Sequence, residues 1–131
     1  MRKLIKTAAI VSAALAIILA GMYLFITRGL DAKSQPVLVG VTAQGLDDGA
    51  YEGGYTSGRF TNRVTVTVAE EKMVGIALTR DVMFPEAKVS ADLFGQVIKA
   101  QSTKVDTITN ATATCNAYLK AIENALTGKE E

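Results

Sequence analysis

The chain has 131 residues, 49% of them apolar, and a formal net charge of +1. This length allows one domain plus a targeting segment. The chain contains no histidine and a single cysteine, Cys115. That composition excludes histidine-based acid–base catalysis, histidine metal sites, an intramolecular disulfide and multi-cysteine metal centres. We therefore expect no catalytic side chain and no metal site, and we expect any chemistry to come from a bound group.

The charges divide unevenly along the chain. Arg2, Lys3 and Lys6 precede a long apolar stretch, so the remainder holds 11 basic and 13 acidic residues and carries −2. No basic cluster occurs in that remainder. We expect no nucleic-acid partner, because binding a phosphate backbone requires concentrated positive charge.

The N-terminal segment predicts a membrane helix. Ala8 to Ile26 is an uncharged run of 19 residues. As a helix it would be about 28 Å long, close to the hydrocarbon thickness of a bilayer. We interpret residues 1–27 as an uncleaved membrane anchor. The alternative is a cleavable signal peptide, which fits less well because the apolar run continues past the small residues near Ala20.

The flanking charges predict the orientation of this helix. Three Lys or Arg precede the apolar run, and two, Arg28 and Lys33, follow it closely. Because the more positive flank stays in the cytoplasm, we expect a single pass through the cell membrane with a cytoplasmic N-terminus and an extracytoplasmic body. Residues 28–47 are interpreted as a tether, with a candidate edge strand at Pro36 to Val41, and residues 48–128 as the domain.

The body begins with strand-like segments. Tyr51 to Phe60 contains three glycines, which indicates either a bulged strand with a turn or close approach of a flat ligand to the backbone. From Asn62 the residues alternate between apolar and polar, and the alternation resumes after the charged turn Glu70-Glu71-Lys72. This pattern predicts an antiparallel hairpin. The residues expected on its apolar face are Val64, Val66, Val68, Val74, Ile76 and Leu78.

Two helices are predicted to cover that hairpin. The first has Ser90 as its N-cap and Asp92 in its first turn. The second runs from about Ala113 to Leu126 and has Gly128 as its C-terminal cap. The fold class is therefore α+β, a small antiparallel sheet covered by two helices and preceded by one transmembrane helix. The expected apolar stripes are Leu93, Phe94, Val97, Ile98 and Ala100 in the first helix, and Cys115, Tyr118, Leu119, Ile122 and Leu126 in the second.

The segment between these helices has the composition of an anion site. Residues 105–116 are rich in small hydroxylic side chains and lead directly into the second helix. The first N–H groups of a helix lack internal partners and its dipole is positive at that end. A phosphate near Thr112 would meet those groups. The alternative is a simple helix start, capped by Thr112 or Thr114, with no ligand.

The same segment resembles a known modification motif. Residues 106–112, Asp-Thr-Ile-Thr-Asn-Ala-Thr, are similar to the flavinylation motif of the FMN-binding domain family, which has Asp, two variable residues, Ser or Thr, usually Gly, and then Ala-Thr. The resemblance implies that a flavin transferase, with FAD as donor, joins FMN covalently to Thr112 through a phosphodiester. It implies further cofactor-binding or recognition positions at Asp106, Thr109, Asn110, Ala111, Ala113 and Thr114.

The chain departs from this motif at two positions. Asn110 replaces the usual glycine, and asparagine tolerates a left-handed backbone better than most residues. Cys115 stands where serine is common. It is either an oxidisable thiol near a helix N-terminus or a buried small residue on the helix stripe, and we favour burial.

The resemblance covers about residues 48–126 and implies a redox role. It implies a membrane-anchored extracytoplasmic flavoprotein that shuttles electrons between membrane redox donor and acceptor proteins, rather than a stand-alone enzyme. The alternative is a membrane-tethered binding or sensory module with non-covalent flavin or none. Arg59 is a candidate partner of the reduced flavin or a solvated charge, and the candidate ring contacts are Tyr51, Tyr55, Phe60 and Phe84.

Overall fold

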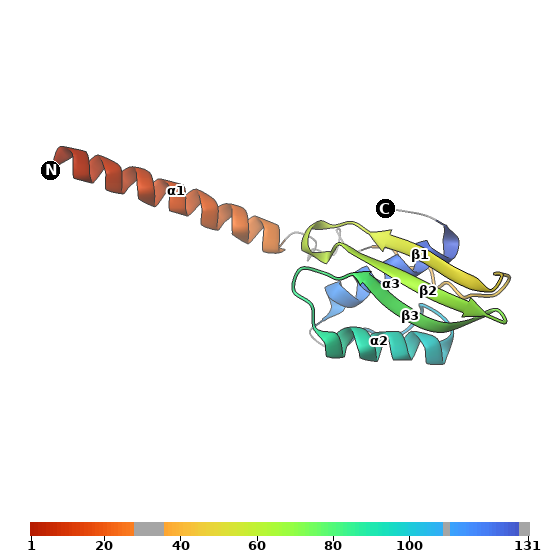
Figure 1. Ribbon diagram of the computed structural model, residues 1–131. Coiled ribbons are helices and arrows are strands. Elements are labelled where there is room, and N and C mark those ends of the chain that lie inside the picture. Colours follow the sequence, from red (N-terminus) through yellow and green to blue (C-terminus); the bar gives the residue numbers. More distant parts are fainter. Residues whose placement is uncertain (28–35, 109–110, 129–131) are drawn as a thin grey trace.

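The computed structural model describes residues 1–27, 36–108 and 111–128 (Figure 1). Its body contains an antiparallel sheet of three strands in the order β1 (Gly49–Tyr55), β2 (Asn62–Ala69) and β3 (Lys72–Arg80). Helix α3 (Thr112–Thr127) packs on β1 and β2, and helix α2 (Ala87–Ala100) packs on β3 and α3. The predicted α+β class, with a small sheet covered by two helices, is confirmed.

The N-terminal helix stands apart from this body. Helix α1 (Arg2–Thr27) has 26 residues, none of them buried, and it extends away from one end of the sheet (Figure 1). Its length and composition are sufficient to cross a membrane. The last turn of α1 meets the body at the short 3-10 helix η2 (Gly58–Phe60).

The predicted hairpin is formed by β2 and β3. Val64, Val66 and Val68 are at most 1% exposed and form the centre of the core. The connecting turn uses Glu70 and Glu71, both with positive φ (53° and 59°), as a two-residue turn with the twist of a β-hairpin requires.

One residue of this hairpin does not face the core as expected. Val68 pairs with Met73 and Thr67 pairs with Gly75, which leaves Val74 without a partner at a β-bulge. A bulge inserts one extra residue and shifts the alternation of faces. Met73 therefore takes the core position at 1% exposure, whereas Val74 is 55% exposed. The prediction that Val74 faces the core was wrong, while Ile76 and Leu78 pack against the core as expected.

One glycine of β1, Gly53, serves helix packing. A Cβ added to Gly53 would lie 2.6 Å from the carbonyl oxygen of Ala121 and would clash with the backbone nitrogen of Ala125. Only glycine lets α3 approach the strand this closely. The group that approaches the backbone at Gly53 is therefore α3 and not a flat ligand. Strand β1 pairs with β2 in regular register, without the expected bulge.

Helix α2 begins earlier than predicted. Its N-cap is Glu86, and Ser90 lies buried in the first turn, where its hydroxyl donates to the carbonyl oxygen of Ala87 at 3.1 Å. The prediction of Ser90 as N-cap was wrong, and Asp92 falls beyond the first turn. Ala87 and Lys88 are good helix formers, which explains why the helix extends further towards its N-terminus.

The residues that precede β1 pack on the body. No strand forms at Pro36 to Val41, so the expected edge strand is absent there. The segment is nevertheless fixed, because Ala43 is 1% exposed and the N–H of Thr103 donates to the carbonyl oxygen of Val41 at 3.0 Å. Part of the segment predicted as a tether is thus packed against the domain.

Candidate functional site

The candidate site is the N-terminus of α3. Ala111 is the N-cap and Thr112 is the first helical residue. The helix starts in regular geometry, since the N–H of Cys115 donates to the carbonyl oxygen of Ala111 at 2.8 Å. Alanine has no side chain that can accept a hydrogen bond, so the N-cap residue itself provides no side-chain cap. The predicted alternative, a cap formed by Thr112 or Thr114, is therefore not what the structure has.

A helix start with alanine as its N-cap residue leaves a place for an anion. The first N–H groups of a helix have no internal acceptors, and replacing a capping residue by alanine typically costs about 1 kcal/mol. A phosphate oxygen can accept from those N–H groups and lies at the positive end of the helix dipole. The start of α3 thus has the donors that a phosphate needs, and its N-cap residue has no side chain that would compete for them.

The side chain of Thr112 is accessible. The residue is exposed, whereas its neighbours Ala111, Ala113 and Thr114 are half-buried. Its hydroxyl lies near the hydroxyl of Thr107, at an Oγ1–Oγ1 distance of 3.5 Å. The loop therefore folds back so that two threonines separated by five positions meet at the helix start. A modifying enzyme could reach the Thr112 hydroxyl without unfolding the core.

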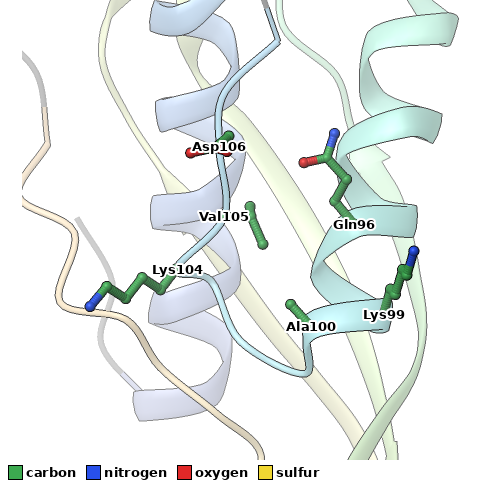
Figure 2. Close-up of a pocket in the computed structure, with 6 residues that line it drawn as sticks. All are labelled: Gln96, Lys99, Ala100, Lys104, Val105 and Asp106. Atoms are coloured by element: carbon green, nitrogen blue, oxygen red, sulfur yellow. The ribbon is translucent and has the colours of Figure 1, made fainter.

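The remaining motif residues are spread along the loop. Asp106 is exposed and lines a cavity of about 460 Å³ between the loop and α2 (Figure 2). Thr112 does not line this cavity. The cavity is therefore not part of the site at the start of α3. Thr109 and Asn110 lie outside the described residues. The cavity is lined by Gln96, Lys99, Ala100, Lys104, Val105 and Asp106.

The first turns of α3 are held from below by buried groups. Cys115 is 0% exposed, which confirms the favoured prediction of burial. Burial raises the pKa of its thiol, and a backbone hydrogen bond at Ile108 opposes this only in part. The thiol is thus a packed core group rather than a reactive one. The rest of the predicted stripe, Tyr118, Leu119, Ile122 and Leu126, is also buried, and Gly128 caps the helix with φ of 71°.

A hydrogen bond ties α3 to the β3–α2 connection. The hydroxyl of Tyr118 donates to Asp81 Oδ1 at 2.5 Å, and the N–H of Val82 donates to the same oxygen at 2.7 Å. Burial, followed by the hydrogen bond and charge of Asp81, raises the pKa of Tyr118. The ring of Tyr118 also packs edge-on against Phe94 of α2, with centroids 5.6 Å apart. These contacts fix the helix start relative to the loop that follows β3.

Most of the candidate ring contacts are core residues. Tyr55 and Phe60 are buried, and Tyr51 donates its hydroxyl to the carbonyl oxygen of Asp47. Phe84 is different, since it is 57% exposed. Arg59 is not a free charge, because its guanidinium lies 4.3 Å from the centre of the Phe60 ring.

Sequence reasoning missed one buried charge. Glu123 lies on the apolar face of α3 at 2% exposure. Its Oε1 accepts from the N–H of Gly40 at 3.0 Å and from the hydroxyl of Thr103 at 2.8 Å. Its place in the helical period, one residue after Ile122 and four after Leu119, could have indicated that it faces inward.

Comparison with protein families identifies the chain. Residues 36–127 match the FMN-binding domain. The chain belongs to this family, as the resemblance of residues 106–112 predicted. The match starts at residue 36, where the segment packed against the body also begins. No curated protein matches the chain.

Proposed function

We propose that this protein is a membrane-anchored, extracytoplasmic flavoprotein that carries FMN covalently on Thr112 through a phosphodiester and shuttles electrons between redox partners. The observation that carries the proposal is the exposed Thr112 at the start of α3, where the N-cap residue is alanine, in a chain of the FMN-binding domain family. FMN would supply the redox chemistry, and the protein its attachment and surroundings.

The residues at this position fit the group. The hydroxyl of Thr112 supplies the ester oxygen, and its exposure gives a flavin transferase access. The first N–H groups of α3 can donate to the remaining phosphate oxygens, and the helix dipole adds stabilisation of about 1 kcal/mol. Covalent attachment suits a body outside the cytoplasm, because the group cannot dissociate into the surroundings.

The anchor supports a role beside membrane redox proteins. Helix α1 is long and apolar enough to span a bilayer, and the basic residues Arg2, Lys3 and Lys6 favour a cytoplasmic N-terminus. The body would then lie outside the cytoplasm, where the flavin transferase acts. Its partners would be a donor and an acceptor of electrons in or near the same membrane.

The attachment site is tested by modification of the full-length chain. We expect co-expression with a flavin transferase to give flavin fluorescence in a denaturing gel and a mass gain of one FMN less one water. Thr112→Ala should abolish both signals. The matched control is Thr127→Ala, an exposed threonine at the other end of the same helix, which should keep them. Covalent flavin in Thr112→Ala would refute the assignment of the site.

The same experiment separates the second candidate function. A wild-type chain that stays unmodified beside a competent transferase would favour a membrane-tethered binding or sensory module with non-covalent flavin or none. Orientation needs its own measurement. A reporter enzyme that is active only outside the cytoplasm, fused after Glu131, should be active, and activity of a cytoplasmic reporter at that position would contradict the proposed topology.

A further inference from the structure

The end of α1 is joined to the body by a specific contact. The Nε of Arg59 in η2 donates to the carbonyl oxygen of Ile26 at 2.7 Å. This oxygen is one of the last four helix carbonyls, which have no partner within the helix. An unpaired carbonyl is costly beside hydrocarbon, and a positive charge suits the negative end of the helix dipole. Arg59 therefore satisfies the helix end at the point where it meets the body.

An exposed apolar pair lies beside this junction. Met83 and Phe84, in the connection between β3 and α2, are 56% and 57% exposed. The N–H of Met83 donates to the carbonyl oxygen of Arg59 at 3.0 Å, and the Phe84 ring centre lies 5.8 Å from the Arg59 guanidinium. We call Arg59, Met83 and Phe84 the junction surface. The same arginine that holds the anchor thus also contacts the exposed pair.

The position of the anchor places this surface at the edge of a bilayer. The uncharged run from Ala8 to Ile26 fills the hydrocarbon thickness, so the carbonyl of Ile26 lies where the hydrocarbon ends. The headgroup layer beyond it is roughly 5–8 Å thick. The Arg59 side chain contacts both that carbonyl and the Phe84 ring. Phe84 therefore lies at headgroup depth. Figure 1 shows the β3–α2 connection at the end of the body from which α1 extends.

We propose that the junction surface docks on the phospholipid bilayer that α1 spans, with Phe84 and Met83 inserted at the boundary of headgroups and acyl chains. Aromatic rings and arginine are favoured at this depth, because the ring contacts the ends of the acyl chains and the guanidinium contacts the lipid phosphates. The residues near the pair in the sequence carry charges of both signs: Arg80 and Lys88 are basic, and Asp81 and Glu86 are acidic. Docking therefore depends on apolar insertion and does not require anionic lipid.

Docking would set the position of the candidate flavin site. The first turn of α3 lies at the same end of the body as the β3–α2 connection (Figure 1), and Asp81 bonds that connection to Tyr118 of α3. The docked body would hold Thr112 close to the membrane surface, within reach of membrane redox proteins. This inference rests on the proposed anchoring by α1, and not on the presence of flavin.

The chain is suited to a fluorescence test because it contains no tryptophan. Two full-length variants, Phe84→Trp and Val74→Trp, each carry a single reporter at an exposed apolar position. Val74 is 55% exposed and lies near the hairpin turn, at the opposite end of the sheet. Both are prepared without a flavin transferase, so that flavin does not quench the reporter, and placed in phosphatidylcholine nanodiscs with or without bromine atoms near the headgroup end of the acyl chains.

We expect brominated lipid to reduce the emission of Phe84→Trp and leave that of Val74→Trp unchanged. The emission of Phe84→Trp should also lie at shorter wavelength and resist quenching by iodide in the water. Equal insensitivity of both variants to brominated lipid would overturn docking. Protection of Phe84→Trp from iodide without quenching by brominated lipid would also overturn it, in favour of a second copy or a partner protein. A chain that fails to co-purify with nanodiscs would refute the anchor, and docking with it.

Discussion

The buried carboxylate of Glu123 should hold the segment before β1 against the body. Its Oε1 accepts three hydrogen bonds, from the N–H of Val39 at 3.1 Å, the N–H of Gly40 at 3.0 Å and the hydroxyl of Thr103 at 2.8 Å. Thr103 in turn accepts from the N–H of Val41 at 2.8 Å. Replacing this one acceptor would release all three donors at once.

The expected magnitude follows from the number and type of these bonds. A hydrogen bond to a charged group contributes about 1.5–3 kcal/mol, and partial access of water to the released N–H groups returns part of that. We expect Glu123→Ala to lower the stability of the packed segment by about 2–4 kcal/mol. Glu123→Gln keeps one acceptor oxygen and should lose less.

Hydrogen exchange of the full-length chain in detergent measures this effect locally. A loss of 2–4 kcal/mol corresponds to about 30- to 1,000-fold faster exchange at the amides of Val39 and Gly40. The matched control is Glu52→Gln, because Glu52 is exposed and its 3.7 Å ion pair with Arg63 is worth at most about 1 kcal/mol. Unchanged exchange at Gly40 in Glu123→Ala would refute the assigned role of the carboxylate.

Three further predictions concern the support of α3. Gly53→Ala should lower the free energy of unfolding in urea by about 3 kcal/mol or more, because the added Cβ meets the backbone of α3. The control Gly95→Ala has open space around its Cβ and should raise the free energy of unfolding by about 0.5–1 kcal/mol. Equal effects of the two changes would contradict the packing argument. Tyr118→Phe should cost about 1–2 kcal/mol near neutral pH through loss of its bond to Asp81. Folding raises the pKa of Tyr118 above its ordinary value of 10.0, so the folded state binds the phenolic proton more tightly than the unfolded state. The resulting stabilisation is present below about pH 10 and is lost as the pH rises further. If the wild-type chain and Tyr118→Phe lost the same stability at high pH, this reasoning would be contradicted. The thiol of Cys115 should react with a maleimide only when denaturant opens the core, and prompt labelling of the native chain would show that it is not buried.

The hairpin and the last helix could be predicted from the sequence because their patterns are local. Val64, Val66 and Val68 alternate with polar residues, and the stripe of α3 repeats at helical spacing, so burial follows from the period alone. The prediction for Val74 was wrong, because a bulge depends on how two strands pair and cannot be recognised from the alternation of one strand. The predicted start of α2 at Ser90 was wrong for a related reason, since in sequence a serine in the first turn of a helix resembles an N-cap.

The candidate site was only partly predictable. The motif around Thr112 indicated the position, and the helix start was predicted within one residue. The sequence could not show that Ala111 would be the N-cap, nor that Thr107 would fold back to Thr112. Glu123 was missed because one charge on an apolar stripe looks like a helix edge until its partners, 84 and 83 residues earlier in the chain, are known. From that packing we propose that the domain begins near residue 36 and not at 48.

The most direct test of the central claim is peptide mapping of the modified protein. The chain is exposed to a flavin transferase with FAD, digested with trypsin, and the fluorescent peptide is sequenced by mass spectrometry. Cleavage after Lys104 and Lys120 places all the candidate threonines on one peptide, residues 105–120. The account predicts FMN on Thr112 alone. FMN on another residue of that peptide, or a peptide that remains unmodified, would contradict it.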